Sequence, residues 1–200
     1  MKKMILALAG SLLLGSMLMG CGSTEKSTGK TDGSAAVTAK SEEKTEDNVD
    51  AQMKTIETDN GTYEVGVLDG WEEIDPVEVN DYADLALENA AKDMYFMILA
   101  ESEDDYASFD DFLDMNDPSE MVDSVLEEED QEINTDNWTG TRKIFTGEFD
   151  GIKVFYIYDL VASNNGHYAQ RIAWTSNSKK AKNEESMLQT IDLVTDVSDE

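Results

Sequence analysis

Three short turn sequences divide the C-terminal two-thirds of the chain into strand-length segments, and they constrain its fold more than any other feature. They are Asp59-Asn60-Gly61, Asp150-Gly151 and Ser163-Asn164-Asn165-Gly166. Asn, Asp and Gly tolerate the positive backbone angles of tight hairpins, and each turn lies between runs rich in apolar and β-branched residues. The sequence therefore predicts antiparallel hairpins, with strands at 54–58, 62–68, 142–149, 152–162 and 167–175.

A further hairpin is expected between residues 82 and 100. Residues 82–94 contain good helix formers, but they also alternate apolar and acidic side chains, and this period of two favours a strand. Residues 94–100 form a continuous apolar run, which is typical of a strand buried on both faces. The turn of this hairpin is predicted at 90–93, and another strand is predicted at 133–139.

Helices are predicted between and after these strands. Ser108 can cap a short helix that ends at Met115, and Asp117-Pro118-Ser119-Glu120 has the cap and the proline that open another. Met121, Val122, Val125 and Leu126 would form the apolar stripe of that second helix. A last helix is expected after Ser178, with Ala181, Met187, Leu188 and Ile191 on one face. Antiparallel strands with helices grouped between and after them indicate an α+β domain.

The first 21 residues have the pattern of a bacterial lipoprotein signal. Lys2 and Lys3 precede an apolar stretch from Met4 to Met19, which is short for a membrane-spanning helix. Leu18-Met19-Gly20-Cys21 resembles a lipobox, and Cys21 is the only cysteine of the chain. The resemblance implies cleavage before Cys21 and a thioether-linked diacylglycerol on its sulfur. We therefore expect a lipid-anchored protein at the extracytoplasmic face of the cell membrane.

The chain divides into three parts. Residues 1–20 are the predicted signal peptide. Residues 21–53 are a predicted flexible tether, because they are rich in Ser, Thr, Gly, Lys and Glu and almost free of apolar periodicity. Residues 54–200 are predicted to form a single α+β domain of ordinary size.

Parts of this domain resemble a known family. A Gly-Trp turn at 70–71, the segment ADLALENAAKDMYFMILAES, and TGEFDGIKVFYIYDLV with HYAQRIAWT before a terminal helix resemble small bacterial lipoproteins with the PsbP-like fold. The resemblance covers about residues 54–195. It implies an antiparallel sheet with helices packed on both sides, a role in protein binding or assembly, and no shared catalytic motif.

Charge is the most unusual property of the sequence. The 44 acidic and 15 basic residues give a formal net charge of -29, which excludes nucleic acid as an expected partner, because phosphate binding needs clustered Lys and Arg. Such a domain would also be repelled by anionic lipid headgroups. Residues 93–141 contain 17 acidic residues and no Lys or Arg, whereas residues 142–182 contain seven basic and three acidic residues. The predicted helical insert is therefore a negative surface, which either keeps the protein solvated or binds a cation or a basic partner.

The candidate sites for chemistry are few. The acidic residues near 110–117 lack the spacing of a calcium-binding loop, so no metal site and no cofactor are predicted. His167 is the only histidine, and its place after a turn predicts an exposed side chain without a role. A ligand groove could be lined by Trp71, Tyr156 and Trp174, although strand alternation makes most of the aromatic residues core residues. Trp138, Tyr158 and Tyr168 are further aromatic residues that could line the same groove or belong to the core.

The function predicted from these features is a membrane-anchored, non-enzymatic binding or assembly module. Its partner would be a basic protein or another component of the cell envelope. Two alternatives stay open, an extracellular cation-responsive protein and a cell-wall or glycan hydrolase with a pair of carboxylates.

Overall fold

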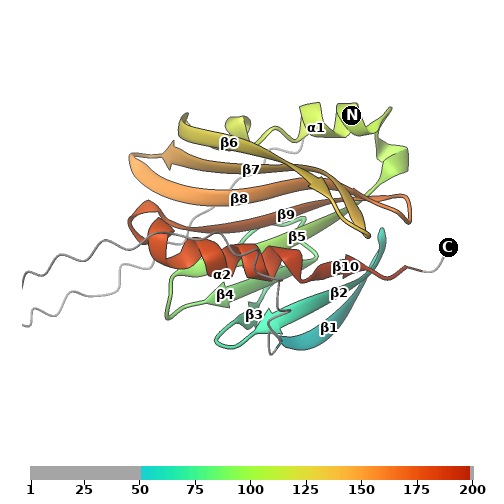
Figure 1. Ribbon diagram of the computed structural model, residues 1–200, viewed down its shortest axis with the longest axis horizontal. Coiled ribbons are helices and arrows are strands. Elements are labelled where there is room, and N and C mark those ends of the chain that lie inside the picture. Colours follow the sequence, from blue (N-terminus) through green and yellow to red (C-terminus); the bar gives the residue numbers. More distant parts are fainter. Residues whose placement is uncertain (1–50, 199–200) are drawn as a thin grey trace, which may run out of the picture. The chain divides into compact units, whose positions relative to one another are not determined.

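The first predicted hairpin is confirmed, and it starts earlier than expected. The computed structural model describes residues 51–198, in which β1 (Ala51–Thr58) pairs antiparallel with β2 (Gly61–Leu68) around a turn at Asp59 and Asn60 (Figure 1). Gly61 has a φ of 121°, a conformation that side chains other than glycine rarely adopt. The short strand β10 (Val194–Asp196) pairs with the other edge of β2 and completes a three-stranded sheet.

The predicted tether is three residues too long. Ala51, Gln52 and Met53 are paired with β2, so they belong to the domain. In the sequence alone, a short polar strand cannot be distinguished from a linker, because its partner strand is not known. Residues 21–50 lie outside the described residues, as do the predicted signal peptide and Cys21.

A second, larger sheet contains seven antiparallel strands in the order β3-β4-β5-β9-β8-β7-β6. They are β3 (Glu72–Ile74), β4 (Leu85–Asn89), β5 (Met94–Ser102), β6 (Ser124–Asn134), β7 (Trp138–Phe149), β8 (Ile152–Ser163) and β9 (His167–Ser176). The turns predicted at 90–93, 150–151 and 163–166 join β4 to β5, β7 to β8 and β8 to β9. The hairpin pattern of the sequence is therefore confirmed.

Two α-helices and four 3-10 turns complete the domain. Helix α1 (Phe109–Met115) is capped by the Ser108 hydroxyl as predicted. Helix α2 (Lys180–Asp192) lies against β9 and β5 (Figure 1). The 3-10 turns are η1 (Pro76–Glu78), η2 (Glu103–Asp105), η3 (Pro118–Met121) and η4 (Asn177–Lys179).

Each face of the larger sheet packs its own hydrophobic cluster. The first cluster joins the sheet to α2 through Met187 and Ile191, and to the small sheet through Tyr63 and Val65. The second cluster joins the opposite face to α1 through Phe112. Strand β5 contributes to both clusters, which explains why its sequence is apolar at almost every position.

The helix predicted from Asp117 is wrong. The turn η3 follows the Asp117 cap and Pro118 as expected, but the chain then enters strand β6, and the residues predicted as an apolar stripe do not share a helix face. Val125 pairs with Gly147, and Leu126 is 44% exposed. Pairing with β7 overrides the helix propensity of the Glu-rich segment. The strand predicted at 133–139 is instead two strand ends, because a turn at 135–137, closed by a hydrogen bond from the Thr135 amide to the Trp138 carbonyl, separates β6 from β7.

The start of the last helix also differs from the prediction. Ser178 lies inside η4 and caps nothing, while α2 begins at Lys180 without a side-chain cap. Ala181 is exposed, and the buried face of α2 is formed by Asn183, Met187, Thr190 and Ile191.

The predicted antiparallel α+β domain is confirmed. The finer prediction of helices packed on both sides of the sheet is not confirmed, because helix is scarce and α1 has only seven residues. Within residues 51–198, no helix is long and apolar enough to cross a bilayer.

Candidate binding surface

Strand β6 forms an exposed acidic edge of the larger sheet. It pairs with β7 on one side only, because it is the last strand in the order, and Ile133 is its only buried residue. Five of its eleven residues are acidic. They are Glu127, Glu128, Glu129, Asp130 and Glu132. We call these five side chains and the backbone that carries them the acidic edge.

Two lysines neutralise part of the acidic edge. Lys143 on β7 lies 3.1 Å from Glu128 and 3.4 Å from Asp130, measured from its Nζ to a carboxylate oxygen. Lys180 on α2 lies 3.3 Å from Glu127. No Lys or Arg contact within 4 Å is present for Glu129 or Glu132 among residues 51–198. The acidic edge therefore keeps an excess of negative charge beside unpaired strand backbone.

Beneath η2 and α1, a buried polar network contains a carboxyl group without a cationic partner. Glu101 at the end of β5 is 7% exposed and accepts hydrogen bonds from the Tyr106 hydroxyl and from Gln170 Nε2. Gln170 Nε2 also lies 3.0 Å from Asn116 Oδ1, and its amide oxygen accepts from the Tyr158 hydroxyl. The network ties the strands β5, β8 and β9 to the chain around α1.

Burial raises the pKa of Glu101, and the hydrogen bonds from Tyr106 and Gln170 oppose that effect only in part. The raised pKa has a cost at neutral pH, because the carboxylate is held in a site that favours its protonated form. The network joins the chain around η2 and α1 to the sheet, and its contribution to the stability of the domain therefore depends on pH. The burial of Glu101 could not be predicted from the sequence, because Glu101 lies at the end of an apolar strand where an acidic residue usually faces solvent.

We expect Glu101→Gln to change how stability depends on pH. A carboxyl group whose pKa is raised by folding stabilises the folded state fully below its unfolded pKa, and this contribution is lost as the pH rises through the folded pKa. As the pH falls from 7 to about 4.5, which is the ordinary pKa of a glutamate side chain, the wild type should therefore gain stability relative to Glu101→Gln. Urea denaturation of both proteins across this range measures the gap. The exposed Glu103→Gln is the matched control, and a gap that is the same at both ends of the range would contradict the expectation.

His167 is not an exposed bystander, which corrects the prediction. Its Nδ1 lies 2.8 Å from an oxygen of buried Asp196, and a quarter of its side chain is exposed. The Ser198 hydroxyl donates to the other oxygen of Asp196 at 2.6 Å and accepts from the Thr62 amide at 2.8 Å. Burial raises the pKa of Asp196, but hydrogen bonds from Ser163, Ser198 and His167 together lower it to about 2.

This group contains the residue types of a hydrolytic triad in a different arrangement. In a triad the imidazole lies between the carboxylate and the nucleophilic hydroxyl. Here the Ser198 hydroxyl donates its proton directly to the carboxylate of Asp196 and accepts a hydrogen bond from the Thr62 amide, so its proton is not directed at the imidazole. The group fastens β10 to β9 and β2, so its role is to close the small sheet.

On the face of the sheet that packs against α2, two arginines surround one aspartate. The strand register places Arg142 on β7, Asp159 on β8 and Arg171 on β9 directly opposite one another. Arg142 donates to Asp159 through Nε at 2.7 Å and Nη2 at 2.9 Å, and Arg171 Nη2 donates to it at 2.7 Å. Asp159 is fully buried. Nη2 of Arg142 also donates to Asp192 at the end of α2, at 2.7 Å.

The Arg171 guanidinium lies over the indole of Trp138, with 4.9 Å from its Cζ to the ring centroid. The indole Nε1 in turn donates to the Val194 carbonyl at 2.8 Å. The charged cluster therefore joins three central strands, α2 and β10. Both arginines pair with Asp159 inside the domain, which indicates a structural role, although Arg171 Nε is buried without a hydrogen-bond partner among the described residues.

Two of the three aromatic residues proposed as a groove are neighbours, because Tyr156 on β8 lies directly opposite Trp174 on β9. Trp71 is buried in the first hydrophobic cluster and Tyr156 in the second, on opposite faces of the sheet. Trp174 is partly buried and stacks on Tyr95, with 5.4 Å between the ring centroids. Trp71 is therefore on the other face from Tyr156 and Trp174, which pack with the second hydrophobic cluster as sheet-face residues.

Within the part of the chain that the structure describes, no three His, Asp or Glu side chains form a metal-binding group.

Salt should still stabilise the domain, because like charges repel within a Debye length of about 8 Å at physiological ionic strength. We expect NaCl and CaCl2 at equal ionic strength to raise the melting temperature by nearly the same amount. Thermal melts titrated with each salt measure this. A saturating shift specific to calcium would instead reveal a built site, because bound ligand stabilises by RT ln(1 + [L]/Kd).

Two solved structures resemble this fold at low sequence identity. The solution structure of cyanobacterial PsbP (CyanoP) from Synechocystis sp. PCC 6803 is 13% identical, with a TM-score of 0.49, and the match covers 73% of this chain and 93% of that chain. The crystal structure of PA94, a protein of unknown function from Pseudomonas aeruginosa, is 10% identical, with a TM-score of 0.42 and coverage of 68% and 92%. No protein family model matches the sequence. No curated protein matches it. Neither likeness assigns a role to a residue of this chain.

Proposed function

We propose that this chain is a lipoprotein anchored through Cys21 at the extracytoplasmic face of the membrane, and that its α+β domain binds a basic protein along the acidic edge. The observation that carries the binding role is the eleven-residue strand β6, which is exposed and unpaired along one side. No catalytic step is part of the proposal.

An unpaired edge strand can accept an added strand from a partner. The backbone N–H and C=O groups of the edge supply affinity, and side chains beside them supply specificity. Native proteins usually protect such an edge with charged residues, so the acidic residues of β6 also prevent self-association. Glu129 and Glu132, whose charge the lysines of the domain leave uncompensated, are three residues apart and point to opposite faces of the sheet. A partner strand would therefore need Lys or Arg on both of its faces to meet them.

An apolar contact is available beside these charges. Leu126 on β6 is 44% exposed, and it lies next to a register shift between Val125 and Glu127. Such an irregularity bends a strand and turns a side chain outward. The proposed partner segment therefore combines basic residues with one apolar side chain.

The test is site-specific photo-crosslinking from full-length protein in intact cells. A benzophenone amino acid at Gln131, which is exposed on β6, should crosslink a protein with a basic segment. The double substitution Glu129→Lys with Glu132→Lys should remove that adduct, whereas Glu57→Lys with Glu185→Lys makes the same charge change on exposed positions of β1 and α2 and should leave it. The same probe at Gln189 on α2 is the positional control.

The binding role is overturned if Gln131 gives no adduct above the level at Gln189. It is also overturned if the two double substitutions affect the adduct equally, because the acidic edge would then not be the site. For the cation-responsive alternative, no three His, Asp or Glu side chains of residues 51–198 are placed to hold a metal ion together.

A further inference from the structure

The chain between β5 and β6 covers part of one face of the larger sheet, but its backbone is hardly bonded to that sheet. This segment, residues 103–123, contains η2, α1 and η3 (Figure 1). The amides of Phe112 and Asn116 donate to carbonyls within the segment itself. Among the described residues, its one backbone hydrogen bond to a strand comes at its end, where the Asp123 amide donates to the Glu148 carbonyl at 2.8 Å. We call residues 103–123 the acidic strap.

The acidic strap carries nine acidic residues and no Lys or Arg. They are Glu103, Asp104, Asp105, Asp110, Asp111, Asp114, Asp117, Glu120 and Asp123. No Lys or Arg nitrogen of residues 51–198 lies within 4 Å of any of these carboxylates. Like charges four residues apart on a helix, such as Asp110 and Asp114 on α1, destabilise that helix. Uncompensated charge therefore acts against the closed position of the strap.

Side chains hold the strap against the sheet. The rings of Tyr106, Phe109 and Phe112 pack around Tyr168 of β9, with 5.8, 5.3 and 5.0 Å between the ring centroids. Beside these rings, the Tyr106 hydroxyl donates to the buried carboxyl group of Glu101. A helix of seven residues is too short to be stable alone, so α1 depends on these contacts for its structure.

The titratable groups that face Glu101 are all acidic or phenolic. They are Asp105 and Tyr106 of the acidic strap, Asp84 before β4, Tyr158 on β8 and Tyr168 on β9. Lys143 lies opposite Tyr158 on the same face of the sheet, but it pairs with Glu128 and Asp130. Burial raises the pKa of Glu101, and no Lys or Arg of residues 51–198 lies within 4 Å to offset this effect.

A change of pH therefore acts on the strap through Glu101. Opening of the strap would expose the Glu101 carboxyl to water and return its pKa towards the ordinary value of about 4.5. The closed position binds the proton more tightly than the open one. Closure is thus favoured fully below the ordinary pKa, and this contribution is lost as the pH rises through the raised pKa.

We propose that the acidic strap is a pH-dependent cover, which opens from the sheet at neutral pH and closes when Glu101 takes up a proton. The strap can open alone, because its backbone hydrogen bonds are internal while β5, β8 and β9 stay paired with one another. Opening exposes Tyr168 and the apolar side chains around it, which the closed strap hides. The inference is independent of the proposed lipid anchor and of binding at the acidic edge.

The test is amide hydrogen exchange of the full-length protein at about pH 7.5 and about pH 5.5. Protection is the exchange rate of the unstructured chain divided by the measured rate at the same pH. Low concentrations of urea should not accelerate exchange at Phe112 and Asn116, whereas they should accelerate it at Ile172 in β9, the control. Protection at Phe112 and Asn116 should be at least about threefold higher at the lower pH, and Glu101→Gln should remove this increase.

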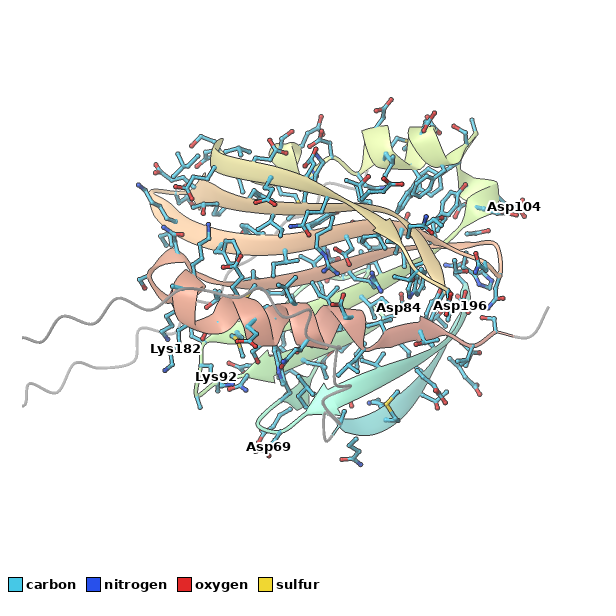
Figure 2. All side chains as sticks on the ribbon, in the orientation of Figure 1. Asp69, Asp84, Lys92, Asp104, Lys182 and Asp196 are labelled. Carbon is cyan, nitrogen blue, oxygen red and sulfur yellow. The ribbon has the colours of Figure 1, made fainter. Side chains whose placement is uncertain are left out.

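A second pair of variants tests the charges of the strap. Asp104→Asn with Asp114→Asn should raise the protection of the strap amides at about pH 7.5 by at least about twofold. The matched control is Asp69→Asn with Asp136→Asn, which removes the same charge from exposed turns outside the strap and should leave that protection unchanged. Figure 2 shows Asp104 at the outer rim of the domain, far from Asp69.

The proposal is overturned if Phe112 and Asn116 have the same urea dependence as Ile172, because the strap would then open only when the whole domain unfolds. It is also overturned if the increase in protection at the lower pH persists in Glu101→Gln. If that variant does not fold, the two double substitutions decide, and equal effects of both on the strap amides contradict the proposal.

Discussion

Replacing Asp159 with asparagine is expected to destabilise the domain by about 3–5 kcal/mol, the usual cost of removing one partner of a buried ion pair. Asp159 is fully buried and accepts three hydrogen bonds from Arg142 and Arg171. Without the negative charge of Asp159, the guanidinium groups of Arg142 and Arg171 would face each other across β8. Burial already lowers the pKa of Arg171, an effect that Asp159 opposes. The substitution would therefore leave a buried positive charge uncompensated.

Urea denaturation of the chain from Gly22 onward measures this loss. The control is Asp136→Asn, which removes the same charge from an exposed turn and should change stability by no more than about 0.5 kcal/mol. If Asp159→Asn cost as little as the control, the three charged residues would not act as a unit. Loss of the folded state altogether would agree with the expectation, because an ordinary domain has only about 5–15 kcal/mol of stability.

Cys21→Ser is expected to abolish lipid incorporation and membrane anchoring completely. The lipid would be transferred to the sulfur of Cys21, and the chain has no other cysteine to accept it. A serine hydroxyl is far less nucleophilic than a thiolate, so it cannot replace the thiol. Metabolic labelling with an alkyne fatty acid, followed by separation of membrane and soluble fractions, measures both effects.

The neighbouring substitution Ser23→Ala is the control, because it leaves the predicted cleavage site and its cysteine intact. Label that persists in Cys21→Ser would refute the lipoprotein assignment. A protein that loses the label but stays in the membrane fraction would show that the apolar segment at 4–19 is retained as an anchor.

The hairpins of this fold could be predicted because their signals are local. Asn60, Gly151 and Gly166 lie in turns whose chemistry is independent of the rest of the chain, and the alternation next to them identifies the strands. Strand β6 could not be predicted in this way. Its run of glutamates has the propensity of a helix, and only the neighbouring strand β7 makes it extended.

The charged cluster also could not be predicted from the sequence. Arg142, Asp159 and Arg171 each occupy a position in a strand where an outward-facing charge is ordinary. Their burial depends on the register of β7, β8 and β9, which brings three residues from separate strands into one row. His167 was misjudged for the same reason, because its partner Asp196 is 29 residues away in the sequence.

The small sheet has a consequence for the way the protein is made. Strand β10 is the last regular element, yet it pairs with β2, so Val194 lies opposite Val65. Contacts between residues so distant in sequence form late and slowly. In the export that we propose, β2 would emerge before its partner β10. The small sheet could therefore close only after the segment that contains β10 had also crossed the membrane.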